Sequence, residues 1–288
     1  MAEKVGIPAL HPAFIRSLGP AILLFGFHYS NPSVADDVRF IPRASLSIAS
    51  YNFTQSARPG ALEPSTINGG DFPEVEFDVT FKIIGVGGTL FKDSYYLDMM
   101  YQQSLDEEDT FSLQDPAIPP DGVFSETFEG DRKDYAVTVG KKFLDNLAGL
   151  YLGYKVGESD ATGDQGERLN FKEDGFFIGG NYGWRINNSG VLSVNLAYAD
   201  LDGDLEEKVN NPLFSPTLST DASSDAKGLS YGISWASRLT DKLSYSLALD
   251  TRKYTFKNVK SNDRTLTPPS DEFEEKFFSA SASIYYLF

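Results

Sequence analysis

Apolar and small polar residues alternate along the last segment of the chain, residues 276–288. Its odd positions include Ser279, Ser281 and Ser283. The apolar residues at its even positions are Phe278, Ala280, Ala282, Ile284, Tyr286 and Phe288. A period of two predicts a β-strand with one apolar face. Because the segment stays apolar up to a final aromatic residue, we expect this face to meet lipid.

Nine further segments from Arg39 onward repeat this alternation, which predicts about ten strands in all. The clearest lies at residues 75–83, and its glycine-rich continuation at 85–88 predicts a bend of the wall. Its side chains expected to face lipid are Val75, Phe77, Val79, Phe81 and Ile83. Its side chains expected to face a lumen are Glu76, Asp78, Thr80 and Lys82.

Short and long connections alternate between these segments. The short ones, at residues 91–94, 143–146, 186–190 and 239–242, contain Asp or Asn, which favour tight turns. The long ones are rich in Pro, Gly, Ser and acidic residues, and the longest covers residues 105–132. Short periplasmic turns and long extracellular loops are typical of a transmembrane barrel. We therefore predict an all-β, antiparallel, up-and-down transmembrane β-barrel.

With Ile284-x-Tyr286-x-Phe288 at its end, the chain resembles the outer-membrane β-barrels of Gram-negative bacteria. In that superfamily, a terminal aromatic strand is the signal that the barrel assembly machinery reads. The resemblance implies a place in the cell outer membrane, with lipid, lipopolysaccharide and the assembly machinery as partners. It names no single family. A water-soluble sandwich or barrel is the alternative explanation of the same alternation.

Aromatic residues make up 14% of the chain, which would supply the two rings of aromatic side chains found at membrane interfaces. The residues expected in the girdle near the short turns are Trp184, Trp235, Tyr245, Tyr286 and Phe288. Those expected near the long loops are Phe77, Tyr101, Tyr154, Tyr198 and Phe278.

The first 35 residues have the pattern of a secretory signal peptide. Lys4 and Arg16 precede a short apolar run at 18–27, and Ser33-Val34-Ala35 has the small-x-small form of a cleavage site. We therefore expect residues 1–35 to be removed and residues 36–288 to form the barrel. A buried N-terminal helix is the alternative.

The composition argues against catalysis and against nucleic acid. The chain contains no cysteine, and its two histidines, His11 and His28, both precede the expected cleavage site. The enzymes known among outer-membrane barrels, including the ten-stranded omptin proteases, depend on histidine, so we expect no enzymatic activity and no cofactor. A formal net charge of −16 argues against binding of nucleic acid.

Two acidic stretches, at residues 106–109 and 200–207, invite comparison with calcium-binding loops. In an EF-hand that begins at Asp200, the sixth and twelfth positions require Gly and Glu, but this chain has Leu205 and Asn211 there. The motif therefore fails. Two explanations of the acidic stretches remain: a looser Ca²⁺ or Mg²⁺ site in the loops, or loops that are simply solvated by their charge.

The polar faces of the predicted strands define a lumen with charges of both signs. The charged residues expected to line it are Arg43, Glu76, Asp78, Lys82, Asp98, Asp134, Lys142, Lys155, Arg185, Asp250 and Arg252. A wet lumen favours a narrow passive channel for small solutes. Mutual pairing of the charges would instead seal it. The protein would then be a non-transporting structural or adhesive surface barrel whose acidic loops bind partners or divalent cations. We rank the channel first, since no catalytic set is present.

Overall fold

The computed structural model describes residues 38–57, 75–105, 107–114, 123–163, 166, 168–187, 189–209, 218–261 and 270–287. The expected signal segment 1–35 and the terminal Phe288 lie outside these described residues. The barrel belongs to one compact unit, Asp37–Phe288. No helix among the described residues is long and apolar enough to cross a membrane.

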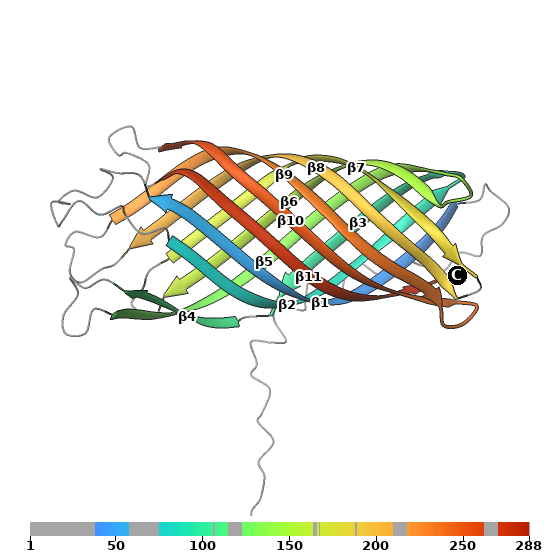
Figure 1. The fold of residues 1–288 in the computed structure, drawn as a ribbon, viewed down its shortest axis with the longest axis horizontal. Coiled ribbons are helices and arrows are strands. Elements are labelled where there is room, and N and C mark those ends of the chain that lie inside the picture. Colours follow the sequence, from blue (N-terminus) through green and yellow to red (C-terminus); the bar gives the residue numbers. More distant parts are fainter. Residues whose placement is uncertain are drawn as a thin grey trace, which may run out of the picture. The chain divides into compact units, whose positions relative to one another are not determined.

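The described chain folds into eleven antiparallel strands of a single sheet (Figure 1). They are β1 (Val38–Ala57), β2 (Val75–Lys92), β3 (Tyr95–Ser104), β4 (Glu107–Gln114), β5 (Val123–Phe143), β6 (Ala148–Gly163), β7 (Arg168–Ile186), β8 (Gly190–Val209), β9 (Leu218–Arg238), β10 (Leu243–Ser261) and β11 (Ser270–Tyr286). Strands adjacent in sequence pair with each other, except β3 and β4, which both pair with β5; β1 also pairs with β11. These pairings close a ten-stranded up-and-down barrel, which confirms the predicted fold.

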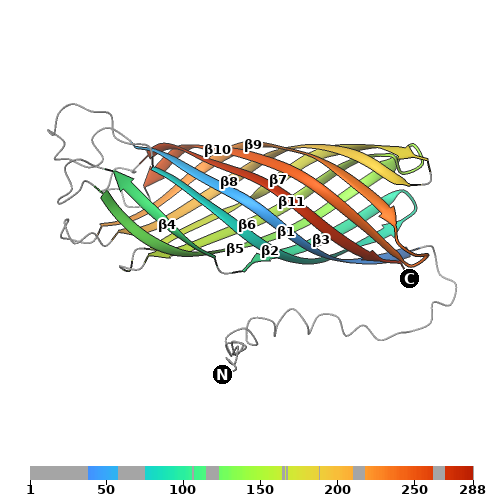
Figure 2. The same ribbon diagram turned by 60° about the horizontal axis from the view of Figure 1, so that its bottom comes forward.

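Strand β4 corrects the prediction of a loop at residues 105–132. It forms a hairpin with the first part of β5, in which Glu107 lies opposite Gly130 and Gln114 lies opposite Val123 (Figure 2). Strand β3 pairs with the rest of β5, so β4 continues the line of β3 after a break at Leu105. The acidic stretch 200–207 was also expected in a loop, but it lies within β8.

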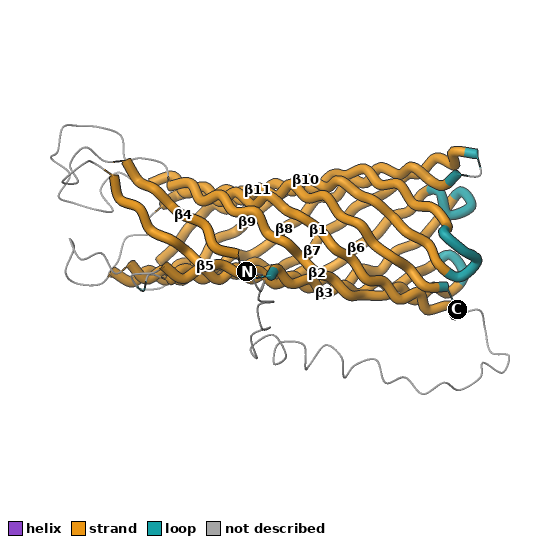
Figure 3. The backbone as a smooth tube through the Cα atoms, turned by 90° about the horizontal axis from the view of Figure 1, so that it is seen from below, coloured by secondary structure: helices purple, strands orange, loops and turns teal. Residues whose placement is uncertain are grey.

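The short turns gather at one end of the barrel, which we call the inner end (Figure 3). Asp93, Asp145, Asn146 and Asn187 adopt left-handed backbone angles there, with φ between 49° and 68°. Asp and Asn tolerate this conformation better than most residues do, which explains their recurrence in these turns. In barrels of this type the short turns face the periplasm.

The strands change their apolar face partway along the barrel. In β1, Ile48 points outward and is exposed, whereas Phe53 points inward and is buried. In β8, Tyr198 is exposed on the outer surface, Leu205 is buried inside, and Asp204 takes the outward position beyond Tyr198. Successive strand residues face opposite sides, so the apolar set moves from the outer to the inner surface of the wall.

This switch divides the barrel into two zones. Nearer the inner end, an apolar band covers the outside, and its exposed members include Leu46, Ile84, Val137, Leu152, Ile178, Leu196, Ile233, Leu249 and Ile284. Toward the other end, the outer end, the outside is charged and the inside is apolar. We call this zone the extension. Strands β6 and β9 contain 16 and 21 residues, more than the roughly 9–11 that cross a bilayer. The extra length forms the extension.

The switch also corrects the prediction for β2. Val79, Phe81 and Ile83 are buried inside the barrel, and Lys82 is exposed on the outside. The lumen-facing assignment of Lys82 is therefore wrong. The predictions for Val75, Glu76, Phe77 and Asp78 concern side chains outside the described residues. The alternation at 79–83 is that of the extension, where apolar residues point inward. The lipid-facing phase begins only at Ile84.

Candidate functional site in the barrel lumen

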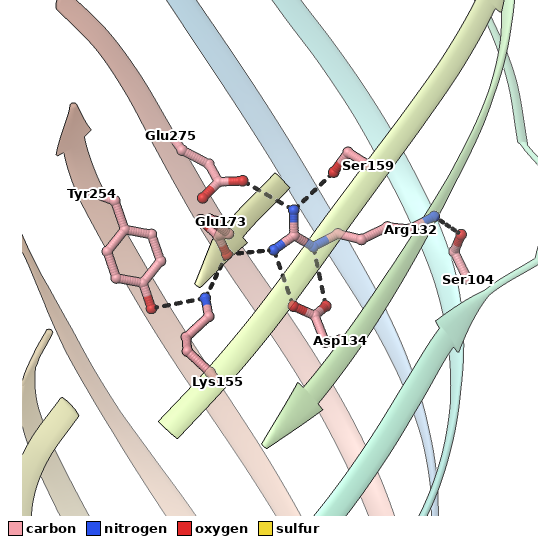
Figure 4. A network of polar contacts seen from close by, with 8 residues as sticks. All are labelled: Ser104, Arg132, Asp134, Lys155, Ser159, Glu173, Tyr254 and Glu275. Carbon is pink, nitrogen blue, oxygen red and sulfur yellow. Dashed lines mark hydrogen bonds and ion pairs between the residues drawn. The ribbon is translucent and has the colours of Figure 1, made fainter. Parts of the chain in front are cut away.

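A layer of buried charges crosses the lumen where the apolar band ends (Figure 4). Arg132 and Asp134 come from β5, Lys155 from β6, Glu173 from β7 and Glu275 from β11. Each occupies an inward position of its strand. The side chains of Arg132, Glu173 and Glu275 are fully buried. We call these five residues the charged layer.

Arg132 is the centre of the charged layer. Its Nε and Nη2 donate to the two carboxylate oxygens of Asp134, each at 3.0 Å. Nη2 also donates to Glu173 Oε1 at 2.7 Å, and Nη1 donates to Glu275 Oε1 at 3.0 Å and to Ser159 Oγ at 2.8 Å. A guanidinium has five N–H donors, so every one of them is used.

Lys155 completes the network on its other side. Its ammonium donates to Glu173 Oε1 and to the Tyr254 hydroxyl at 3.5 Å, and it lies 4.5 Å from the centre of the Tyr254 ring. Two carboxylate oxygens, Glu173 Oε2 and Glu275 Oε2, are buried without a hydrogen-bond partner among the described residues. Three carboxylates therefore face two cations within this layer, and Arg252, which lies 6.0 Å from the centre of the Phe277 ring, is a third cation beside it.

Gly157 leaves the space that the network occupies. A Cβ atom at this position would lie 2.6 Å from Arg132 Nη2 and 2.7 Å from Glu173 Oε1. Both distances are shorter than real contacts of a Cβ atom. Any larger residue would therefore push these two charged groups apart.

An apolar core fills the lumen of the extension. The rings of Phe53 and Phe171 are 5.4 Å apart between centroids, and those of Phe171 and Phe256 are 5.0 Å apart. Phe53 also contacts Phe273 at 5.8 Å. These four side chains come from β1, β7, β10 and β11, so the core bridges opposite walls. Together with the charged layer it places packed side chains across the lumen.

Two cavities lie on the inner side of these layers. The larger measures about 610 Å³ and is lined in part by Arg43, Asp98 and Lys142. The smaller measures about 190 Å³ and borders the charged layer at Lys155 and Asp134. Tyr151 lines both cavities. These two cavities therefore occupy the lumen between the inner end and the charged layer.

The predicted lumen-facing residues divide into three groups. Those with inward positions are Arg43, Asp98, Asp134, Lys142, Lys155, Asp250 and Arg252. Arg185 has inward parity but lies exposed near the inner turns, where its Nη2 donates to the Asp145 carbonyl oxygen at 3.1 Å. Lys82 points outward, as described above, and the side chains of Glu76 and Asp78 lie outside the described residues.

Sequence reasoning missed three members of the charged layer: Arg132, Glu173 and Glu275. Arg132 and Glu173 lie outside the segments that were predicted as strands. Glu275 lies one residue before the predicted last strand, residues 276–288. A signal was present for Glu275, because it lies between Phe273 and Phe277 on the same strand face. A lone charge between apolar neighbours of one parity indicates a buried ionic position.

Most predicted girdle residues occupy outward positions. Trp184, Trp235, Tyr245 and Tyr286 lie toward the inner end, and Phe288 lies outside the described residues. Tyr101, Tyr154, Tyr198 and Phe278 mark the outer edge of the band. Neighbouring rings contact each other there: Tyr101 with Tyr135 at 4.7 Å, and Tyr154 with Phe176 at 5.0 Å.

Among the described residues, the acidic side chains of β8 are not grouped with others as a metal site would require. Asp200, Asp202 and Asp204 are exposed on the outer surface of the extension. In the part of the chain that the structure describes, no group of three or more His, Cys, Asp or Glu side chains is placed to hold a metal ion.

Comparison with known proteins identifies a fold and no family. No protein-family model matches the chain, and no curated protein matches it. The solved structure of the outer membrane protease OmpT from Escherichia coli covers 87% of this chain and 97% of its own, with a TM-score of 0.52 and 12% identity. The translocator domain of the autotransporter NalP from Neisseria meningitidis covers 96% of both chains, with a TM-score of 0.44 and 10% identity.

The likeness to OmpT shows the fold alone, and that fold is the outer-membrane β-barrel of Gram-negative bacteria. The closed wall and its continuous apolar band agree with it. The chain thus has the fold of an outer-membrane β-barrel, which the sequence predicted.

Proposed function

We propose that this protein is a non-conducting surface barrel, which is anchored in the outer membrane and presents its extension and loops to partners outside the cell. The observation that carries the proposal is the closure of the lumen by the charged layer and the apolar core. Sequence reasoning ranked a passive channel first because the lumen looked wet. The filled cross-section favours the second function that the sequence left open.

Energetic reasoning supports a lumen that stays closed. Moving Arg132 aside would break five hydrogen bonds and leave buried carboxylates without a partner. Breaking a buried ion pair costs about 3–5 kcal/mol. Since each 1.4 kcal/mol corresponds to a factor of ten, a cost of about 4 kcal/mol would leave roughly one molecule in a thousand open. Displacing the aromatic rings would lower this fraction further.

The exterior of the extension supports contact with polar partners. Glu274 pairs with Lys253 at 2.6 Å and with Lys276, and Lys257 pairs with Glu272 at 3.2 Å. Cations and carboxylates thus alternate on a surface that water reaches. We include lipid and lipopolysaccharide around the barrel, and the assembly machinery that inserts it, among its partners.

The proposal includes no catalytic role. Histidine and cysteine are both missing from the described residues, so no Ser-His or Cys-His pair is available there. The carboxylates of the charged layer are held by Arg132 and Lys155 and are closed off from the outer end by the apolar core. A substrate from outside the cell would not reach them.

Single-channel recording in a planar bilayer tests the proposal. The refolded protein, shown to be inserted by its heat-dependent gel migration, should give no conductance steps. A porin of known conductance in the same bilayer serves as the positive control. Discrete steps from the wild-type protein, altered in size by Arg132→Ser, would overturn the proposal and place a channel through the charged layer.

A further inference from the structure

The larger cavity has the size and position of a ligand site. Its volume of about 610 Å³ falls within the roughly 300–1,000 Å³ of small-molecule pockets. Its lining includes Ala236, Ser244 and Leu287, which lie close to the turns of the inner end. The charged layer closes the other side. A ligand would therefore enter from the periplasm.

One acidic group in this cavity is already neutralised. Asp98 accepts a hydrogen bond from Arg43 Nη2 at 3.0 Å and another from Thr89 Oγ1 at 2.5 Å. Arg43 also lies against the ring of Tyr285, with 5.8 Å between the guanidinium carbon and the ring centre. Arg43 and Asp98 therefore form a neutral pair on the cavity wall.

Lys142 is the charge that remains. Its ammonium lies 4.5 Å from the centre of the Phe91 ring and 5.9 Å from that of Tyr96. Among the residues that the structure describes, no carboxylate lies within ion-pair distance of it. Removing a cation from bulk water without an anionic partner is unfavourable, and two aromatic faces offset only part of that cost. The described lining of this cavity therefore carries one net positive charge next to apolar surface.

We propose that this cavity binds a small organic monoanion, a carboxylate joined to an aromatic or apolar body, with the carboxylate on Lys142. A single free ammonium fits one negative charge, whereas a phosphate dianion favours several cations. The rings of Phe91, Tyr96 and Tyr151 supply apolar surface for the body of the ligand, and Asn181 adds polar contacts. This inference does not depend on whether the barrel conducts.

Lys141 provides a matched control on the opposite face of the same strand. Its ammonium also lies over two aromatic rings, 5.0 Å from the centre of Tyr95 and 5.6 Å from that of Phe143. Tyr95 and Phe143 are exposed on the outer surface of the barrel. A Lys→Met change therefore removes a similar cation–aromatic contact at either position, but it removes the cavity charge only at Lys142.

The experiment is calorimetric titration of the refolded full-length protein in detergent micelles with 3-phenylpropionate, and in parallel with its neutral amide. Heats from protein-free micelles are subtracted. We expect saturable binding of the carboxylate and at least about tenfold weaker binding of the amide. Lys142→Met should weaken carboxylate binding about tenfold or more, Lys142→Arg should retain most of it, and Lys141→Met should leave it within about twofold.

Three results would overturn the inference: no saturable binding of the carboxylate to the wild-type protein, equal binding of the acid and the amide, or equal losses in the two Lys→Met variants. Heat-dependent gel migration shows whether each variant is folded. If Lys142→Met does not fold, the comparison of acid with amide on the wild-type protein decides the question. Conductance does not enter any of these readouts, so this inference and the proposed function can fail separately.

Discussion

Phe53 and Phe171 lie with their ring centroids 5.4 Å apart, although their strands β1 and β7 are five strands apart in both directions around the wall. Two side chains from opposite walls can meet only where the lumen is filled. Both rings are buried. The inside of the extension is therefore a hydrophobic core of the ordinary kind, and its packing should stabilise the barrel.

We expect Phe171→Ala to lower the free energy of unfolding by about 3–5 kcal/mol, because it leaves a cavity in this core. Urea titration of the protein in lipid vesicles measures the change. Phe176→Ala is the matched control, since that ring is 62% exposed on the outside and its loss creates no internal cavity. Equal effects of the two substitutions would contradict a packed core in the extension.

Removing the cation at the centre of the charged layer should be costly. We expect Arg132→Met to destabilise the barrel by about 3–5 kcal/mol, because buried carboxylates lose their partner. The double variant Arg132→Met/Glu275→Gln should recover part of this loss, and urea unfolding of the four proteins in the cycle gives the coupling energy.

Arg168 supplies the control for that cycle. It pairs with Asp160 at 3.7 Å, and its side chain is 67% exposed. Arg168→Met should therefore change stability by less than about 1 kcal/mol. A similarly small effect of Arg132→Met would mean that the charged layer contributes little to holding the lumen closed.

Gly157 should tolerate no side chain. We expect Gly157→Ala to destabilise the barrel by about 1–3 kcal/mol, since its Cβ would overlap Arg132 Nη2. At Gly130, on the neighbouring strand, the nearest heavy atom to an added Cβ is 3.5 Å away, an ordinary contact. Gly130→Ala is therefore the control, and equal stability of the two variants in urea would exclude this role of Gly157.

A lysine should destabilise the barrel to different extents at two outward positions on β8. Leu196 belongs to the apolar band, so Leu196→Lys should cost about 2–4 kcal/mol in lipid vesicles. Asp204 lies on the water-exposed exterior of the extension, so Asp204→Lys should cost less than about 1 kcal/mol. Unfolding in vesicles measures both values. A large cost at Asp204 would place the lipid boundary elsewhere.

Cysteine labelling can test the corrected orientation of β2, because the natural chain contains no cysteine. A membrane-impermeant maleimide should react with Thr80→Cys, which is exposed on the extension. It should spare Phe81→Cys, which is buried in the core, and Ile84→Cys, which faces lipid. Mass spectrometry of the refolded protein gives the labelled fraction at each site. Labelling of Phe81→Cys without labelling of Thr80→Cys would contradict this orientation of β2.

Local alternation was sufficient to predict the wall. In β11, Phe278, Ala280 and Ile284 face outward, and Ser279 and Ser283 face inward, as the period of two required. The same rule failed in β2. Val79 and Phe81 alternate equally well, but a period of two does not say whether the apolar face meets lipid or a core. Only the change of phase between Ile83 and Ile84 distinguishes them.

The charged layer lay beyond sequence reasoning for another reason. Arg132 and Glu275 are separated by 143 positions and belong to strands on different sides of the wall. Their meeting depends on the register of every intervening strand pair, which no local pattern contains. That Lys142 has no carboxylate partner among the described residues is likewise a property of the closed barrel, since it depends on which side chains the other strands bring to the cavity.

The extension determines how far the described part of the wall reaches beyond the apolar band. Beyond Tyr198, β8 continues for about ten residues to Val209. At about 3.3 Å per residue and a tilt of about 40°, this corresponds to about 25 Å of height. The barrel wall thus continues beyond the membrane as the extension, which has an apolar core inside and a charged, water-exposed surface outside. A partner that binds the outer end therefore binds at a height above the membrane that is set by the hydrogen-bonded strands and not by the thickness of the lipid.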